Sequence, residues 1–528
     1  MFQISYFSKI IVIFTTLVIL QGCRGSEIRS GSFEGDLLIK SAPVIEKPII
    51  NFSVEPHPFL APPELSTIHS GGYNSDVHSA SGPLGINPKV VSRQGSTAPG
   101  GMYATTTFDN QGLMIVFMGS FAGFELNLLE PRSLKLLAKY DLPQRPSTFE
   151  GVVKMDADVF MKDTSSSYFY LDQQGYAVIA NSTQHIQRLG HRQKSNGDWE
   201  FFLDQSWDIS GHVPNDCMSL TNWFPSQECD PITSVTPDHN GLIWWVTLHG
   251  RIGTLNPNTD AIKSIQLKNE EIQNSFAAAR DGIYIVSDYA MYGFKTDKNG
   301  APLVIWREQY DRGDSRKLGA ISQGAGSTPT LLGDDYVVIA DNANPKVNLL
   351  VYRRKPDIKG NRLVCKVPLF NDDKSAVEIS MIAWNRSIIT KNDYGYTNAF
   401  QQETWDQVAG GFTRIDIRED ESGCDIVWTS PEISPSVVPK LSAGNGLVYS
   451  YTFETQSNGE NIWYLMALES STGKTAFKIR TGAGSKFDGN WGPLAIGPDG
   501  TAYITVYGGM ISIWDQPLQD SLITYSSP

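Results

Sequence analysis

The sequence has little helical periodicity and no basic cluster. Outside the N-terminal residues, apolar side chains rarely recur at helical spacing, which excludes a helical bundle and predicts little helix. The chain has 43 basic and 56 acidic residues, a formal charge of -13, and no Lys/Arg-rich stretch interrupts this balance. Such a surface repels a polyanion, so nucleic acid is not an expected partner.

The motifs of several site classes are also missing. No Cys-x-x-Cys pair occurs, and thiolates would be oxidised outside the cell, so a zinc site is not expected. No Gly-x-Ser-x-Gly occurs, and Ser327 in GAGSTP lacks the strand, turn and helix that a nucleophile elbow requires. The sequence therefore contains no motif of a serine nucleophile.

What the chain has in abundance is short runs of β-branched and aromatic residues between turn clusters. Residues 231–267 contain four such runs: ITSVT, LIWWVTL, RIGTLN and AIKSIQL. Asn240-Gly241 and His249-Gly250 supply the positive φ of tight turns, so this stretch is predicted to form a four-stranded antiparallel sheet. Because LIWWVTL is apolar on both faces, the sheet needs neighbours that cover both sides.

The same pattern recurs along the chain. A small turn followed by an apolar run, which marks the second strand of the unit, occurs again at Phe108, Leu171, Ala279, Leu332, Ala383, Ala443 and Gly497. The resulting eight units, spaced roughly 40 to 65 residues apart, are typical of radially repeated sheets. We therefore predict an all-β fold, a single β-propeller of four-stranded antiparallel blades, with eight blades favoured and seven as the alternative. An aperiodic pair of sandwiches would not keep this order of turns and strands.

Residues 1–23 have the pattern of an export signal, with one lysine and a roughly ten-residue apolar run that is too short to span a membrane. The run ends in LQGC, which resembles the bacterial lipobox. This resemblance implies lipidation of Cys23 and a bacterial lipoprotein anchored in the cell envelope. Because Arg24 rather than Asp follows, the outer membrane is expected in a Gram-negative cell. An ordinary secretory signal is the alternative.

Residues 24–100 are rich in Pro, Ser and Gly and are predicted to be a tether that includes His69 and His78, whereas residues 101–528 form the propeller. Within the tether, Lys47–Val54 alternates like a strand. The last blade has three evident strands, GPLAIG, TAYITVY and GMISIWD. We therefore expect Lys47–Val54 to complete this blade, because an unpaired edge would expose backbone donors and acceptors.

Four cysteines follow Cys23, an even number that permits two disulfides in an exported protein. Cys217 and Cys229 flank a short loop, and we expect them to be bonded. Cys365 and Cys424 fall on the outer strands of successive blades, and their pairing stays open because the distance between such strands can exceed that of a disulfide.

Polar residues precede several predicted innermost strands, where the loops of a propeller converge on its axis. They are Asp230, Asn274, Thr328, Glu378 and Asn490. Asp230, Asn274, Glu378 and Asn490 offer the hard oxygen ligands that Ca²⁺ prefers. They resemble the ligands of gluconolactonase, phosphotriesterase and paraoxonase-like propellers. The alternative is that these side chains cap strand ends and line a solvated channel.

The resemblance to these hydrolases implies a hub calcium that polarises a lactone carbonyl or a phosphoryl oxygen. A general base would then be His212 or His249, because imidazole titrates near neutral pH. His249, in a turn of the 231–267 unit, is otherwise expected to be solvated. Tyr394, Tyr396 and Trp491 are the candidates for an aromatic platform that binds a carbohydrate.

A second resemblance is to the repeat of pyrroloquinoline quinone (PQQ) propellers. It lies in STPTLLGD from Ser327 and in MALESSTGKTAFK from Met466, where Phe477 stands in place of the usual Trp. The quinoprotein enzymes carry a disulfide of adjacent cysteines, which this sequence lacks, so a quinone cofactor and dehydrogenase activity are the least expected outcome. Non-catalytic relatives of this repeat include lipoproteins of outer-membrane assembly.

The sequence thus leaves two main classes of function. The first is a lipid-anchored envelope propeller that binds a protein or a small ligand without catalysis. The second is a Ca²⁺-dependent hydrolase of lactones or organophosphates.

Overall fold

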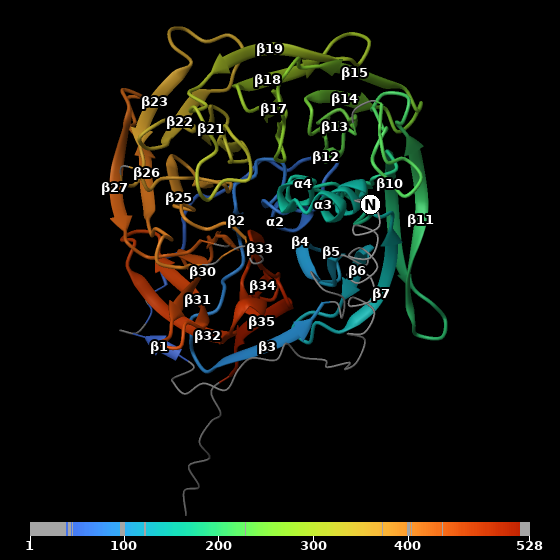
Figure 1. Cartoon of the computed structure of the whole chain (residues 1–528). Coiled ribbons are helices and arrows are strands. Elements are labelled where there is room, and N and C mark those ends of the chain that lie inside the picture. The colour runs from blue at the N-terminus through green and yellow to red at the C-terminus, as the bar shows by residue number, and fades with distance from the viewer. Residues whose placement is uncertain are drawn as a thin grey trace, which may run out of the picture.

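Eight separate antiparallel sheets stand around a common axis, each with its first strand innermost (Figure 1). The predicted eight-bladed β-propeller is therefore confirmed. The computed structural model describes residues 38–40, 44, 46–95, 101–120, 123–226, 229–371, 373–398, 402, 404–435 and 437–517.

The first four blades are continuous in sequence. Blade 1 consists of β4 (Met102–Phe108), β5 (Met114–Ser120), β6 (Gly123–Leu129) and β7 (Leu136–Leu142). Blade 2 consists of β8 (Tyr170–Leu171), β9 (Ala177–Ala180), β10 (His185–Gln193) and β11 (Trp199–Asp208). Blade 3 consists of β12 (Ile232–Pro237), β13 (Ile243–Thr247), β14 (Arg251–Leu255) and β15 (Ile262–Gln266). Blade 4 consists of β16 (Ala277–Ala279), β17 (Gly282–Val286), β18 (Ala290–Thr296) and β19 (Pro302–Gln309).

Blades 5 and 6 are continuous as well, whereas blades 7 and 8 include strands from the N-terminal part of the chain. Blade 5 consists of β20 (Thr330–Leu332), β21 (Tyr336–Ala340), β22 (Asn348–Arg353) and β23 (Leu363–Pro368). Blade 6 consists of β24 (Ile382–Trp384), β25 (Ser387–Lys391), β26 (Phe412–Ile417) and β27 (Cys424–Ser430). Blade 7 consists of β29 (Lys440–Ser442), β30 (Leu447–Thr455), β31 (Asn461–Glu469) and β32 (Thr475–Ala483), flanked by β2 (Val77–His78) and β1 (Leu38–Lys40). Blade 8 consists of β33 (Gly492–Ile496), β34 (Ala502–Val506), β35 (Gly509–Asp515) and β3 (Pro88–Gln94), with β28 (Val437–Val438) beside β33.

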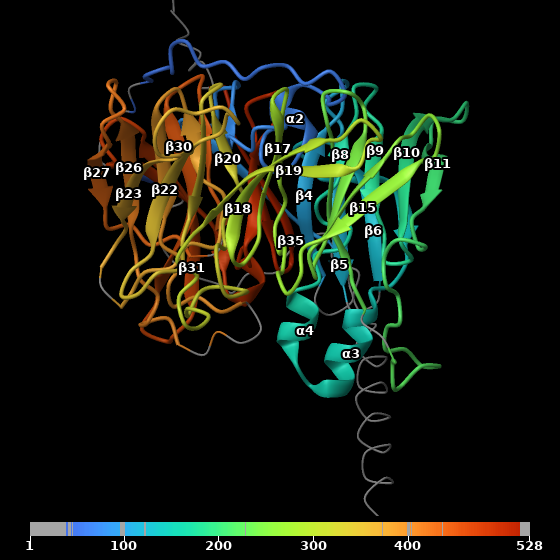
Figure 2. The ribbon, with the colours of Figure 1, turned by 90° about the horizontal axis from the view of Figure 1, so that it is seen from above.

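Every apolar run predicted to be a second strand is one, from β5 in blade 1 to β34 in blade 8. The sequence predicted a low helix content. Helix in the described residues is limited to α2 (Pro63–Ser66), α3 (Pro146–Lys154), α4 (Ala157–Met161) and the 3-10 turn η1 (Ser485–Phe487). Helices α3 and α4 lie between β7 and β8 and project from one face of the disc (Figure 2). We refer to this face as the helical face.

Two adjacent tryptophans of β13 connect blade 3 to the blades on either side of it. Trp244 and Trp245 in β13 point to opposite sides of their sheet, because side chains alternate along a strand, and both are fully buried. Trp244 packs with Ile283 of blade 4, whereas Trp245 packs with Val178 of blade 2. A Cβ at Gly253 would lie 2.0 Å from the Trp245 ring, so this strand position requires glycine. Each blade thus covers the apolar face of the next.

The ring is closed by β3, which pairs with β35 from Pro88↔Asp515 to Gln94↔Gly509. A strand from the N-terminal region does complete the last blade, but the expectation that this strand is Lys47–Val54 is wrong. That segment instead runs along blade 7, where the N–H groups of Lys47 and Ile49 donate to the carbonyls of Asn445 and Ala443. Pro48 between them is tolerated because alternate N–H groups of an extended segment point to opposite edges, so its missing N–H removes no hydrogen bond to blade 7.

A second N-terminal segment fills the axis of the ring. The carbonyls of Gly72, Tyr73, Ser75 and Asp76 accept hydrogen bonds from the innermost strands of blades 4, 5, 6 and 7 in turn, at 2.8–2.9 Å. These donors are Ala278, Leu331, Ala383 and Leu441. The segment therefore replaces the tether expected there. The folded unit includes residues well before the predicted boundary at residue 101.

Both cysteine pairs downstream of Cys23 form disulfides. Cys217 is bonded to Cys229, the pair favoured by the sequence, and Cys365 is bonded to Cys424 with a Cα–Cα distance of 5.9 Å. The second pairing is allowed because β23 and β27, the outer strands of neighbouring blades, contact each other. Cys23 and its predicted lipid lie outside the described residues. Within the described part of the chain, no helix is long and apolar enough to cross a membrane.

Candidate functional site

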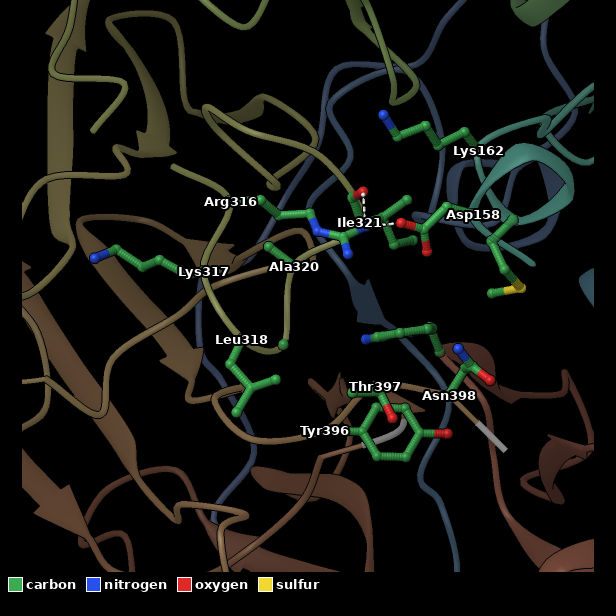
Figure 3. A pocket seen from close by; sticks show the side chains of 13 residues that line it. Asp158, Lys162, Arg316, Lys317, Leu318, Ala320, Ile321, Tyr396, Thr397 and Asn398 are labelled. Carbon is green, nitrogen blue, oxygen red and sulfur yellow. Dashed lines mark hydrogen bonds and ion pairs between the residues drawn. The ribbon is translucent and has the colours of Figure 1, made fainter. Parts of the chain in front are cut away.

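Three adjoining cavities open where the axis meets the helical face. The central cavity, of about 240 Å³, lies between α4, the loop that enters blade 5 and the loop after β25 (Figure 3). An apolar chamber of about 190 Å³ shares Met161, Ile321 and Trp491 with it. A larger groove of about 810 Å³ shares Asp158 and Arg316 with it on the other side. Loops of five blades and the helical pair thus converge on one site.

An ion pair separates the central cavity from the groove. Asp156 caps α4 by accepting from the N–H of Asp158, and this places the Asp158 carboxylate towards the axis. Arg316 donates through Nη1 to Asp158 Oδ2 at 2.7 Å and to the carbonyl of Ile321 at 3.3 Å (Figure 3). Lys162 follows α4 and lines both spaces, and its ammonium has no partner among the described residues. The cavity is therefore lined by three cations: Arg316, which Asp158 neutralises, Lys162, and Lys317, which donates to Asn344 Oδ1 at 2.7 Å.

Two of the predicted platform aromatics form a wall of the central cavity. The rings of Tyr396 and Trp491 meet edge to face with centroids 4.8 Å apart. Tyr396 donates to Asp488 Oδ1 at 2.8 Å, and burial raises the pKa of its hydroxyl well above the usual value. Asn490 and Trp491 both have positive φ, 42° and 57°, which is strained for a bulky residue. Such strain is typical of functional sites, where the surrounding structure holds it in place.

The neighbouring chamber is apolar with a buried arginine at its side. Met102, Phe117 and Phe124 line it, and the Arg145 guanidinium lies 4.5 Å from the Phe124 centroid. Arg145 also donates to the carbonyl of Asp163 at 2.5 Å. The guanidinium is therefore held in place by the protein, and the chamber offers mainly apolar contact to a ligand.

The structure uses three of the four predicted calcium ligands for hydrogen bonds within the protein. Asp230 accepts from Thr247 Oγ1 at 2.7 Å and from the N–H of His249 at 2.9 Å, which fixes the turn of blade 3. Asn274 donates to the carbonyl of Gly326 at 2.6 Å. Asn490 lies beside Tyr396 and donates to the sulfur of Met102 at 3.3 Å. The described residues contain no group of three or more His, Cys, Asp or Glu side chains arranged to hold a metal.

Glu378 differs from the other three. It is buried near the axis, and neither carboxyl oxygen has a side-chain hydrogen-bond partner among the described residues. Asn274 and Glu378 are brought together at Gly326, where a Cβ would lie 2.3 Å from Glu378 Oε2. Burial raises the pKa of Glu378 well above its usual value, hydrogen bonding to the backbone of Ile321 opposes this shift, and the charge of Asp393 adds to it. Burial therefore favours the protonated form of this carboxyl group.

The two candidate bases lie outside the central cavity. His249 is in the turn before β14 and lines the groove together with Glu270 and Asp288. His212 is half-buried after β11, in a turn where its N–H donates to the carbonyl of Ile209. Neither histidine lies among the residues that line the cavity or the apolar chamber.

A buried polar cluster on the axis was not predicted from the sequence. Asp76 binds Lys440, His69 and Ser380, and all four side chains are buried. Ser380 contacts His69 through Nδ1 at 2.8 Å, the same nitrogen that faces Asp76. A serine relay needs its serine on the opposite nitrogen, where His69 instead faces Thr328 Oγ1 at 3.5 Å. Ser380 and Lys440 lie more than 300 residues from His69 and Asp76 in sequence, which is why no local pattern could reveal the cluster.

The comparisons with known proteins assign no family to this chain. No model of a known protein family matches the sequence. An uncharacterized protein of Archaeoglobus fulgidus is 28% identical over 384 residues, which cover 64% of this chain and 73% of the relative. This likeness does not reach the level that would assign the chain to a family.

Among solved structures, BamB from Moraxella catarrhalis is similar with a TM-score of 0.35 and 10% identity, covering 65% of this chain and 92% of BamB. A streptogramin B lyase structure has a TM-score of 0.39 and 10% identity, covering 81% of this chain and 97% of the lyase. The predicted resemblance to propeller superfamilies is confirmed as a likeness of fold by the ring of eight sheets itself.

Proposed function

We propose that this chain is a lipid-anchored propeller of the cell envelope that binds a small ligand, without catalysis, in the cavities beneath α3 and α4. The observation that carries the proposal is the junction of the polar cavity with the apolar chamber at Trp491, at the place where the loops of the ring converge. Binding pockets combine an apolar lining with a few polar groups in this way.

The chemistry of the two spaces favours an amphipathic ligand. An apolar body fits the chamber lined by Met102, Phe117 and Phe124, and an anionic or polar head lies near Lys162 and Arg316. The groups that line the two spaces are suited to holding such a ligand through apolar contact and charge.

The binding test uses anilinonaphthalene sulfonate, an amphipathic anion whose fluorescence rises in apolar surroundings. We expect saturable binding at one site per chain. Ala320→Trp, which fills the central cavity, should abolish binding, whereas Ala261→Trp on an exposed turn should not. Equal binding to both variants, or only unsaturable binding to the native chain, contradicts the proposed site.

The anchor is tested separately. Cells fed an alkyne-tagged fatty acid should label the native protein and not Cys23→Ala, because the lipid is expected on that thiol. Labelling that survives the substitution, or that is absent from the native protein, leaves the binding site intact as a proposal and removes the anchor.

A second candidate, the calcium-dependent hydrolase, is favoured by the two unpartnered oxygens of Glu378. A bound cation would explain why this carboxyl is kept near the axis, although Asp230, Asn274 and Asn490 already have hydrogen bonds in the protein. Calcium should then raise the melting temperature of the native chain and leave Glu378→Gln unaffected. The absence of a calcium effect on the native protein would remove this candidate.

A further inference from the structure

Large apolar side chains gather in one exposed cluster on the helical face. Three of the most exposed in the described chain are Phe224, at 92%, Met155, at 78%, and Leu220, at 75%. Val152 and Trp223 are also exposed. These five residues come from α3 with its C-terminal cap and from the loop closed by the Cys217–Cys229 disulfide. We refer to them as the apolar tip.

The loop part of the tip is rigid. The disulfide closes it, Asp216 accepts from Asn222 at 2.6 Å and from Ser226 Oγ at 2.9 Å, and the Trp223 indole donates to the carbonyl of Leu220 at 3.1 Å. A side chain held in this way loses little conformational entropy on binding. Nothing within the described chain covers Phe224, so the loop presents this ring outwards.

Ring packing joins the loop to the helix. Phe149 of α3 meets the Trp223 ring edge to face, with centroids 5.6 Å apart. Val152 lies one turn after Phe149 on α3, and residues three apart share one face of a helix. The two parts of the tip are therefore neighbours, and α3 projects from the helical face (Figure 2).

The N-terminal end of β1 points to this same face. β1 pairs antiparallel with β32, and the end of β32 leads through η1 to Trp491 at the cavity. Leu38, where the described part of this segment begins, therefore lies at the end of β1 that faces the helical face. Fourteen residues separate Cys23 from Leu38, and an extended chain of that length reaches about 50 Å.

We infer that the apolar tip inserts into the interfacial layer of a lipid bilayer and holds the helical face of the propeller against the membrane. This inference rests on the proposed function for the anchor that brings the bilayer within reach. Trp and Phe at a projecting tip are typical of residues that enter the interface. The inserted tip is a second membrane contact, in addition to the lipid anchor.

The small size of the apolar tip argues against a second copy of the chain as its partner, and the charge of the chain argues against anionic lipid. A stable dimer buries about 800 Å² from each partner, with 20 to 30 residues a side, which five side chains do not supply. The formal charge of -13 disfavours anionic lipid, so the expected surface is zwitterionic and the contact is insensitive to salt.

The test measures partition of the unlipidated chain without its predicted signal, residues 24–528, into extruded phosphatidylcholine vesicles by flotation. Leu220→Ser with Phe224→Ser should lower the partition coefficient at least about tenfold, because two large apolar side chains no longer leave water. The matched control, Ile50→Ser with Ile426→Ser, removes two exposed side chains elsewhere on the chain and should change nothing.

Partition should persist in 0.5 M salt. Absence of vesicle binding by the native chain, or an equal loss in both double variants, overturns the inference, and the first result would point to a protein as the occupant of the tip. The tested chain of residues 24–528 lacks Cys23 and carries no lipid, so the outcome does not depend on whether Cys23 is acylated. Equal melting temperatures of all variants show that the fold is retained.

Discussion

Replacing Lys440 by Met tests whether the plug on the axis holds the ring together. The Lys440 ammonium binds Asp76 and, at 2.5 Å, the carbonyl of Ile68, and both charged side chains of the pair are at most 1% exposed. Removal of the cation leaves a carboxylate in the hub with only Ser380 and His69 as partners. An uncompensated buried charge costs about 3–5 kcal/mol, so the free energy of unfolding should fall by that amount.

The matched control is Lys355→Met, which breaks an ion pair with Asp335 that is 2.7 Å long and in which both side chains are 56% exposed. An exposed pair contributes less than about 1 kcal/mol. Combining Lys440→Met with Asp76→Asn removes both charges, and Asn tolerates the φ of 53° at this position, so much of the stability should return. Guanidinium unfolding followed by tryptophan fluorescence measures all four proteins. The reasoning is refuted if Lys440→Met is as mild as Lys355→Met, or if the double variant is less stable than the single one.

Three further perturbations test the hub and the closing strand. Burial lowers the pKa of His78 to about 3, so the folded protein binds this proton less readily than the unfolded chain. The free energy of unfolding should therefore fall as the pH drops below 6.5, by about 3 kcal/mol at pH 4. His78→Gln should flatten the pH profile of the melting temperature. The raised pKa of Glu378 has the opposite effect on stability. The free energy of unfolding falls as the pH rises above the pKa of this carboxyl in the unfolded chain, so Glu378→Gln should melt higher than the native chain at pH 8 and not at pH 4. In β3, only one of Val91 and Ser92 can point its N–H at β35, so calorimetry should show that one of the two proline variants loses about 3 kcal/mol and the other much less. Equal losses would contradict the closure by β3.

The blades could be predicted because their determinants are local. In 231–267, the turn residues and the apolar run around Trp244 lie within a few positions of each other, and together they require a sheet with neighbours on both sides. The same holds for each second strand, whose turn and apolar run are adjacent in sequence. Repetition of one local pattern then determines a ring, since each blade can be covered only by another like it.

The segment from 60 to 80 could not be assigned from its composition. Its Gly, Ser and Asn residues are typical of a tether, and nothing in the stretch SGGYNSD indicates that its carbonyls bind four blades. The partners of Gly72 and Asp76 follow them by more than 200 and 300 residues. Small residues are needed here because the innermost strands approach closely: a Cβ at Gly72 would lie 2.7 Å from the carbonyl oxygen of Ala278.

The identity of a residue at a strand entry does not distinguish a ligand-binding group from a structural one in a propeller. Asp230 uses both carboxylate oxygens to hold the turn between β13 and β14 of its own blade, and Asn274 uses its amide to hold Gly326 at the entry to the next blade. Only the hydrogen bonds that each side chain makes distinguish a structural residue from a ligand-binding one. Two groups near the cavities differ from these: the Glu378 carboxyl, which has no side-chain partner, and the Trp491 indole N–H, which is buried without a partner among the described residues. A buried polar group without a partner costs stability, so a ligand or an ordered water at these atoms accounts for their retention near the cavities.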